Sequence, residues 1–170
     1  MSAVNTPTVQ KVLASWASIA EPIAQANSLD PDLVLAVMCQ ESAGQTYAVR
    51  VERAFWARYG KAALGIFKAT KNPYDDQWAQ YPDFVSASYG LMQILYETAV
   101  ERGVVVQYPT QLCDPAIGID AGCRQLRYCL TRAGGDVSDA LRRYNGGANL
   151  AYPGEVIAWQ QAIHAARCPQ

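Results

Sequence analysis

Helical apolar periodicity, interrupted by glycines, is the feature of this sequence that most limits its fold. A helix packs on a core when apolar residues recur at three- and four-residue steps, and a glycine commonly follows its last turn. Segments with this pattern alternate with glycines along most of the chain, whereas the strand–helix alternation of a parallel sheet is missing. The sequence therefore predicts a mainly α fold, with helices over about 28–42, about 89–102, from 117 or 120 to 132, 137–144 and about 154–166.

Local signals support two of these helix starts. Either Ser28 or Asp30 can cap the first helix, and Pro31 suits its first turn. Asp136 can cap the helix over 137–144. The apolar stripe from Val9 to Ile23 has the same spacing, so we interpret it as a packed helix rather than a cleaved signal peptide.

Residues 45–86 break the periodicity and are rich in aromatic side chains. We expect a short strand within Tyr47–Arg53 and a helical turn or two over Arg53–Tyr59. Most of the rings should pack on one another, while one or two are candidates to line a groove, where a ring can lie against a sugar face. The aromatic residues of this insert are Tyr47, Phe55, Trp56, Tyr59, Phe67, Tyr74, Trp78, Tyr81 and Phe84.

Composition restricts the classes of partner. The 170 residues are 51% apolar, which predicts one domain spanning 1–170 with its own core. Apolar runs such as Leu33–Cys39 are far shorter than the roughly 20 residues that cross a bilayer, so we expect no membrane insertion. The net charge of −1 gives no field that would attract nucleic acid, and a polymer must be bound by a local groove.

Cysteine and histidine usage predicts neither a metal site nor a cofactor. Five cysteines and a single histidine, His164, lack the paired spacing of a zinc site. Cys39 lies among apolar neighbours, where a thiol acts as a small apolar group. One disulfide among the remaining four is an open alternative, and their spacing does not pair them: Cys113, Cys123, Cys129 and Cys168.

A carboxyl group closes the apolar stripe of the first predicted helix. Leu33, Val34, Val37 and Met38 lie on one face, and Glu41 is the next position on it. Such a carboxyl group must find a partner or raise its pKa, and a raised pKa suits a general acid. The alternative is a glutamate that reaches solvent where the last turn frays.

Two later segments also place a polar group beside apolar residues. Tyr144 lies on the stripe of the helix over 137–144 and is followed by Asn145. A buried tyrosine hydroxyl needs a polar partner. Gln93 stands between Met92 and Ile94, near the expected start of the helix over 89–102.

Together these segments resemble the three signature motifs of the soluble lytic transglycosylases and the related goose-type lysozymes. The resemblance extends from about Pro22 to Trp159. Departures from the family pattern are the aromatic insert, Tyr89 before the second motif, and Gly147. The motifs are Glu41-Ser42, Gly90-Leu91-Met92-Gln93-Ile94 and Ala140-Leu141-Arg142-Arg143-Tyr144-Asn145-Gly146-Gly147. The family's link between the second and third motifs is resembled by two further segments, Leu112-Cys113-Asp114-Pro115 and Ile119-Asp120-Ala121-Gly122.

The resemblance implies an α+β lysozyme-like fold whose catalytic helix ends at Glu41, with at most a small β element. It implies cleavage of the β-1,4 bond between N-acetylmuramic acid and N-acetylglucosamine in peptidoglycan, with Glu41 as the single acid/base. Ser42 would support the helix end, and Met92 and Gln93 would form the groove floor. Tyr144 and Asn145 would orient the glutamate and hold the sugar.

The family mechanism implied by the resemblance needs neither a cofactor nor a second carboxylate. The N-acetyl group of the substrate stabilises the cationic centre, and the muramic 6-hydroxyl then attacks to give a 1,6-anhydro end. The first alternative is a hydrolase with a second carboxylate. Its candidates lie in the insert, with Glu52 and Asp83 foremost beside Asp75 and Asp76. The second alternative is a glycan-binding or structural virion module that does not cut.

The biological setting is predicted from the small size and the lack of a convincing export signal. In both features the chain resembles phage-encoded wall-degrading enzymes, either endolysins or virion-associated proteins whose partners include other virion proteins. We expect the protein in the virion, or in the host cytoplasm until release, and acting in the periplasm or cell wall. An arginine cluster is a candidate contact for acidic wall polymers or a solvated face: Arg124, Arg127, Arg132, Arg142 and Arg143.

Overall fold

The computed structural model describes residues 6–53, 57–58 and 81–168, and the chain divides into two compact units. The first unit comprises residues 1–44 and 123–170, and the second comprises residues 45–122. The described chain is mainly helical with one small sheet, which confirms the predicted fold class. That the whole chain acts as one domain stays a prediction.

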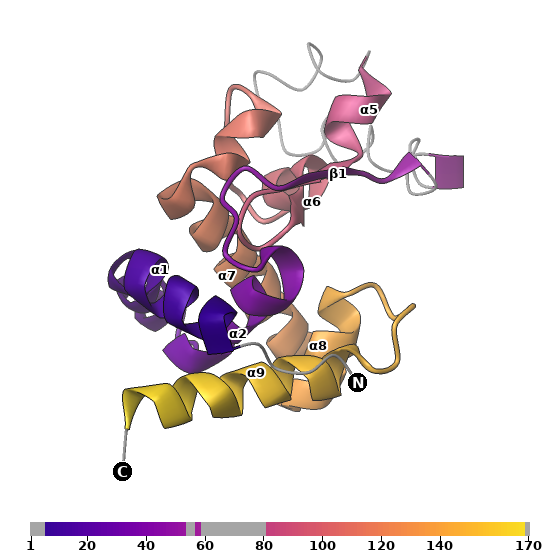
Figure 1. Cartoon of the computed structure of the whole chain (residues 1–170). Helices are drawn as coiled ribbons and strands as arrows, with labels where there is room; N and C mark the ends of the chain where they lie inside the picture. The colour runs from indigo at the N-terminus through magenta and orange to yellow at the C-terminus, as the bar shows by residue number, and fades with distance from the viewer. Residues whose placement is uncertain (1–5, 54–56, 59–80, 169–170) are drawn as a thin grey trace. The chain divides into compact units, whose positions relative to one another are not determined.

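The first unit is organised around α2 (Pro31–Ser42), which packs against α1 (Thr6–Ala26) and α9 (Tyr152–Arg167) (Figure 1). Every residue from Leu33 to Cys39 is buried, so this helix is the centre of the core. Asp30 caps it by accepting a hydrogen bond from the backbone N of Asp32 at 2.9 Å. The helix ends at Ala43, whose φ of 50° is left-handed.

The same unit contains α8 (Val137–Tyr144), which packs against α9, and the end of α7 (Pro115–Arg132). The bounds of α8 match the prediction, and the carboxylate of Asp136 accepts from the backbone N of Asp139 at 2.8 Å. Both α7 and α9 begin earlier than predicted. For α7 the reason is Asp114, whose carboxylate accepts from the backbone N of Ala116 at 3.0 Å and of Ile117 at 3.2 Å.

The second unit contains the sheet, in the order β1-β2-β3 with antiparallel pairing. Its strands are β1 (Val49–Val51), β2 (Ala87–Tyr89) and β3 (Ile94–Leu95). The pairs Arg50↔Ser88 and Ser88↔Leu95 set the register. The short strand predicted within Tyr47–Arg53 is therefore present. The helical elements of this unit are α5 (Pro82–Val85), α6 (Tyr96–Glu101), the 3₁₀ helix η1 (Pro109–Cys113) and the start of α7.

The helix predicted over about 89–102 is wrong in its first half. Residues 87–95 form the β2–β3 hairpin, and only Tyr96–Glu101 is α-helical. Gly90 has a φ of 72° and Gln93 a φ of 48°, which a helix does not allow. A Cβ at Gly90 would also lie 2.2 Å from the carbonyl oxygen of Leu112, so this turn requires glycine. A tight turn, rather than a helical stripe, buries the apolar residues there.

Other predictions for the insert and the cysteines have mixed outcomes. Arg53 and residues 57–58 are helical, and the rest of Arg53–Tyr59 lies outside the described residues. All five cysteines are free thiols, so the disulfide alternative is not realised. No described helix has the length and apolar character needed to cross a membrane.

Candidate active site

Glu41 lies in the last turn of α2, half-buried at the end of the core helix. Its Oε1 accepts a hydrogen bond of 2.6 Å from the hydroxyl of Tyr152, the first residue of α9. Tyr152 is itself only 2% exposed. The glutamate that closes the apolar stripe therefore has a buried polar partner rather than a fully hydrated position.

The electrostatics keep the Tyr152 phenol protonated. Its pKa is raised above the ordinary value, first by desolvation and then by the negative charge of Glu41 and by the nearby Tyr144. A protonated phenol can only donate its hydrogen to a carboxylate. The contact is thus a charge-assisted hydrogen bond whenever Glu41 is ionised.

A second phenol belongs to the same cluster. Tyr144 ends α8 and is half-buried. Desolvation, followed by the charge of Glu41 and then by Cys123 and Cys129, raises the pKa of Tyr144 well above its ordinary value. The first unit therefore brings Glu41 together with two protonated phenols, of which the sequence analysis had singled out only Tyr144.

Tyr152 was missed because the last helix was predicted to begin at about Gly154. The signal was nevertheless in the sequence. Pro153 suits the first turn of a helix. Tyr152 also continues the buried stripe of α9 formed by Val156, Trp159 and Ile163, which places its ring inward.

Two more predicted site residues, Ser42 and Asn145, directly follow members of this cluster in the sequence and form hydrogen bonds at the ends of helices. Ser42 is buried, and its hydroxyl donates to the carbonyl oxygen of Met38 at 3.2 Å. Asn145 is the C-cap of α8, where its backbone N donates to the carbonyl oxygen of Leu141 at 3.1 Å. These contacts define how α2 and α8 end.

Met92 and Gln93 belong to the second unit. Met92 is fully buried, and a Cβ at Gly122 would lie 2.3 Å from its sulfur atom. The Gln93 side chain binds the hairpin, since its Nε2 donates to the carbonyl oxygens of Ala48 and Gly90 at 3.0 Å each. Its Oε1 accepts from the hydroxyl of Ser88 at 3.2 Å. The amide of Gln93 is thus hydrogen-bonded at both ends within its own unit.

The candidates for a second carboxylate also belong to the second unit. Glu52 forms an ion pair with Arg50. The side chain of Asp83 is 66% exposed and lies 3.9 Å from Nε of Arg53. Asp75 and Asp76 lie outside the described residues. Both described candidates are therefore half-buried or exposed carboxylates with an arginine as ion-pair partner.

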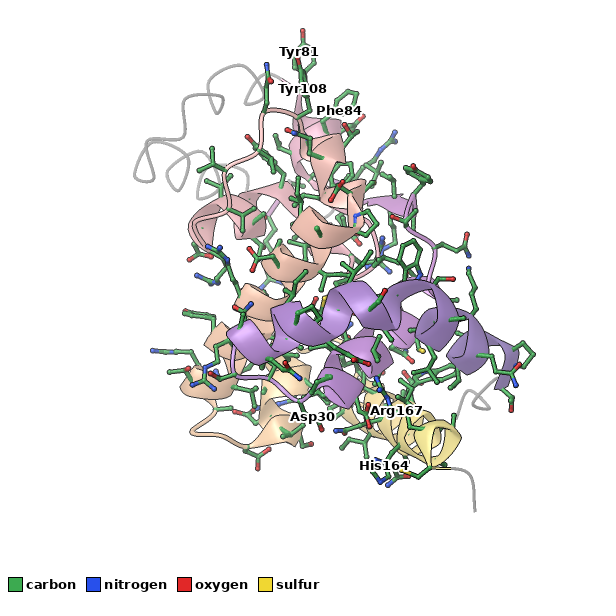
Figure 2. The ribbon with its side chains drawn as sticks, turned by 90° about the vertical axis from the view of Figure 1, so that its left-hand side faces the viewer. Asp30, Tyr81, Phe84, Tyr108, His164 and Arg167 are labelled. Carbon is green, nitrogen blue, oxygen red and sulfur yellow. The ribbon has the colours of Figure 1, made fainter. Side chains whose placement is uncertain are left out.

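The rings of the insert can be assessed only in part. Tyr47 is 83% exposed, and Tyr81 and Phe84 form an edge-to-face pair with ring centroids 6.3 Å apart on the surface of the second unit (Figure 2). The remaining rings lie outside the described residues: Phe55, Trp56, Tyr59, Phe67, Tyr74 and Trp78.

Within the described ranges, no group of three or more His, Cys, Asp or Glu side chains is placed to hold a metal ion. The thiol nearest to Glu41 in sequence is Cys39, and burial raises its pKa to about 12. This thiol stays protonated near neutral pH and is neither a nucleophile nor a ligand. What the cluster can do is proton transfer, because a half-buried carboxyl group is held by the protonated phenol of Tyr152.

One of the comparisons with known proteins gives a match. The family model described as "Transglycosylase SLT domain" matches residues 18–152, which include Glu41, the hairpin of the second unit and both phenols. No curated protein and no solved structure matches the chain.

Proposed function

Because the chain belongs to the transglycosylase SLT domain family, whose activity is peptidoglycan degradation of the lytic transglycosylase type, we propose that Glu41 is its single general acid/base. The proposed reaction cleaves the β-1,4 bond between N-acetylmuramic acid and N-acetylglucosamine. The observation that carries the assignment is the 2.6 Å hydrogen bond from Tyr152 to Glu41 at the end of a buried helix.

In the first step, protonated Glu41 donates its proton to the glycosidic oxygen while the bond from that oxygen to the muramic C1 breaks. The N-acetyl oxygen of the same sugar stabilises the electron-poor C1. In the second step, ionised Glu41 takes the proton of the muramic 6-hydroxyl, and O6 bonds to C1. The proton returns to Glu41, no water is consumed, and the product is a 1,6-anhydro end.

The Tyr152 phenol stabilises the ionised state of the acid. Between the two steps Glu41 carries a negative charge, and the Tyr152 hydroxyl stabilises this carboxylate by donating a hydrogen bond. Before the first step Glu41 is protonated and uncharged, and the bond from Tyr152 is weaker, so the phenol favours the intermediate over the ground state. Tyr144 lies in the field of the same carboxylate, and we assign it an orienting role.

The sugar contacts form the finer part of the proposal. We assign Asn145 of the first unit to sugar binding and, in the second unit, the hairpin of Met92 and Gln93 to the floor of a glycan groove. Since the Gln93 amide already bonds to the hairpin backbone, its contribution would be to shape the backbone rather than to offer a free amide.

Analysis of the products tests the reaction type. Purified sacculi treated with the full chain should yield 1,6-anhydromuramic ends by mass spectrometry. Reducing ends would instead support hydrolysis with a second carboxylate, such as Glu52 or Asp83, and an absence of new ends would support a binding module.

Glu41→Gln tests the residue. The variant keeps the size of the side chain and removes the proton, so activity should fall by about 10²-fold or more. Glu101→Gln is a matched control, since Glu101 is an exposed glutamate at the end of α6. Wall clearance by Glu41→Gln at the parent rate would contradict the assignment of the acid.

A further inference from the structure

Gln40, the residue before Glu41, joins α2 to α9 through both ends of its amide. Its Oε1 accepts from the indole Nε1 of Trp159 at 2.9 Å, and its Nε2 donates to Oε2 of Glu155 at 2.9 Å. An indole N–H only donates and an ionised carboxylate only accepts, so a single orientation of the amide satisfies both partners. The side chain is half-buried, and Trp159 is only 8% exposed.

The partners of Gln40 and Glu41 share one face of α9. Tyr152, Glu155 and Trp159 follow one another at steps of three and four residues, so they lie along the same side of the helix. Two consecutive residues of α2 thus contact three positions of one face. This pattern fixes the register of α9 against the end of α2.

The loop before α9 is hydrogen-bonded to the Glu155 carboxylate, which also binds Gln40. Asn149 donates from Nδ2 to Oε2 of Glu155 at 3.3 Å, and its Oδ1 accepts from the backbone N of Ala151 at 3.0 Å. The first turn of α9, which begins at Tyr152, is therefore held both by its own loop and by Gln40.

We propose that Gln40 is a positioning residue whose amide fixes the first turns of α9, and thereby holds the Tyr152 hydroxyl on the carboxylate of Glu41. The catalytic consequence rests on the proposed function, since Gln40 acts on the reaction only through Glu41. An O–H···O bond of 2.6 Å is lost over a small displacement, and misplacement of a catalytic group by about 1 Å can cost about 10²-fold in rate.

The N-terminal end of α2 provides a matched control contact with α9. There Gln160 donates from Nε2 to Oδ2 of Asp30 at 2.7 Å, and Arg167 donates from Nε to Oδ1 of Asp32 at 2.8 Å. Figure 2 shows Asp30, Arg167 and His164 together at this end. Ten residues of helix separate Asp30 from Gln40, roughly 15 Å, so the contact that Gln160 makes with α2 lies far from Glu41 although Gln160 follows Trp159 in α9.

The first experiment compares Gln40→Met with Gln160→Met in the full chain. Each removes one cross-helix amide and keeps the length of the side chain. On soluble glycan fragments, kcat of Gln40→Met should fall by about 10- to 100-fold with KM within about twofold, because both ends of the Gln40 amide bind α9 in the proposed role and not the sugar. Gln160→Met should keep kcat within about threefold, with a similar change in Tm. Equal kcat values for the two variants would overturn the proposal.

A double-mutant cycle separates positioning from general destabilisation. If Gln40 acts through Tyr152, the variant carrying both Gln40→Met and Tyr152→Phe is no slower than Tyr152→Phe alone. Independent, multiplying losses would refute the coupling. Glu155→Gln keeps an acceptor for Gln40 and should retain most of the activity, whereas Glu155→Leu should lose it. This second pair decides the matter if Gln40→Met does not fold.

A readout without substrate distinguishes failure of this inference from failure of the proposed function. The titration of the Glu41 carboxyl carbon, followed by NMR, should move to higher pH in Gln40→Met, because the ionised form loses its donor, and should stay unchanged in Gln160→Met. A parent protein that leaves sacculi intact would refute the function, while this titration would still decide the role of Gln40. An unchanged titration in Gln40→Met would refute the positioning role.

Discussion

Glu97 gives the sharpest prediction about stability. It lies in the first turn of α6 and is only 8% exposed, and within the described residues its Oε2 has no hydrogen-bond partner. Desolvation, together with the charge of Glu101, raises the pKa of Glu97 from 4.5 to about 7, against smaller opposing effects from Thr98 and Arg102. The folded chain therefore holds a proton on Glu97 at pH values where the unfolded chain has lost it.

This difference fixes the sign of the pH dependence. Because the folded-state pKa is the higher one, the contribution of Glu97 to stability is full below about pH 4.5 and is lost as pH rises through about 7. The total amounts to about 3 kcal/mol, at 1.36 kcal/mol per pKa unit, and about 2.5 kcal/mol of it falls between pH 5 and pH 8. Glu97→Gln removes the titration and with it this loss.

The assay is urea denaturation of the parent and of Glu97→Gln at pH 5, 6, 7 and 8. The difference in unfolding free energy between the two proteins should shift by about 2.5 kcal/mol in favour of the variant from pH 5 to pH 8. Any pH-independent packing cost of the amide cancels in this comparison. Glu101→Gln removes only the second cause and should give a smaller shift of the same sign. Parallel pH curves for parent and Glu97→Gln would refute the reasoning.

Three further predictions follow from single contacts. Tyr152→Phe removes the Tyr152 donor to the Glu41 carboxylate, so kcat should fall by about 10-fold or more and the basic limb of the pH profile of kcat should move to higher pH. An unchanged pH profile would speak against the contact. A maleimide should label one thiol of the native protein, the exposed Cys168, and all five thiols in denaturant, as counted by mass spectrometry. Labelling of a second thiol in the native protein at the rate of Cys168 would contradict the burial of the other four. Gly90→Ala should destabilise the protein by several times the roughly 1 kcal/mol expected for Gly134→Ala, because both glycines have positive φ but only Gly90 faces a carbonyl oxygen. Equal losses in Tm for the two variants would contradict this reasoning.

The helices were predictable from the sequence where local chemistry and apolar periodicity agree. The helices α2 and α8 have a capping aspartate at the predicted place, and their bounds follow from it. The start of α7 was misplaced by a few residues. Asp114 caps this helix by accepting from the backbone N–H groups of Ala116 and Ile117, a local signal that apolar spacing alone does not carry.

The hairpin was not predictable in the same way. Leu91, Met92 and Ile94 are compatible with a helical stripe, and the sequence contains no sign that Gly90 packs against the backbone of Leu112. That close approach is a tertiary constraint between residues more than twenty positions apart. It overrides local helix propensity. The left-handed backbone of Gln93 does the same, and hydrogen bonds from the Gln93 side-chain amide stabilise the turn.

For the candidate site, the sequence predicted the carboxyl group more readily than its partner. Glu41 stands out because a charge ends an apolar stripe, which is visible within one helix. The stripe of α9 indicates that Tyr152 is buried, but its pairing with Glu41 becomes apparent only when α9 is known to lie along α2. The same holds for Gln40, an ordinary polar residue until Trp159 and Glu155 are placed beside it.

The position of Glu41 also explains why a polar network gathers at this end of α2. Seven consecutive buried residues, Leu33 to Cys39, separate Asp32 in the first turn of the helix from the polar side chains of its last turn. Gln40, Glu41 and Ser42 then follow in succession, and each has a hydrogen bond to a different partner. A buried or half-buried polar group without a partner is costly, so these bonds stabilise the end of the helix inside the unit. The contacts that let a carboxyl group lie at the edge of the core are thus the same contacts that orient it for proton transfer, and a variant that breaks one of them should affect both stability and rate.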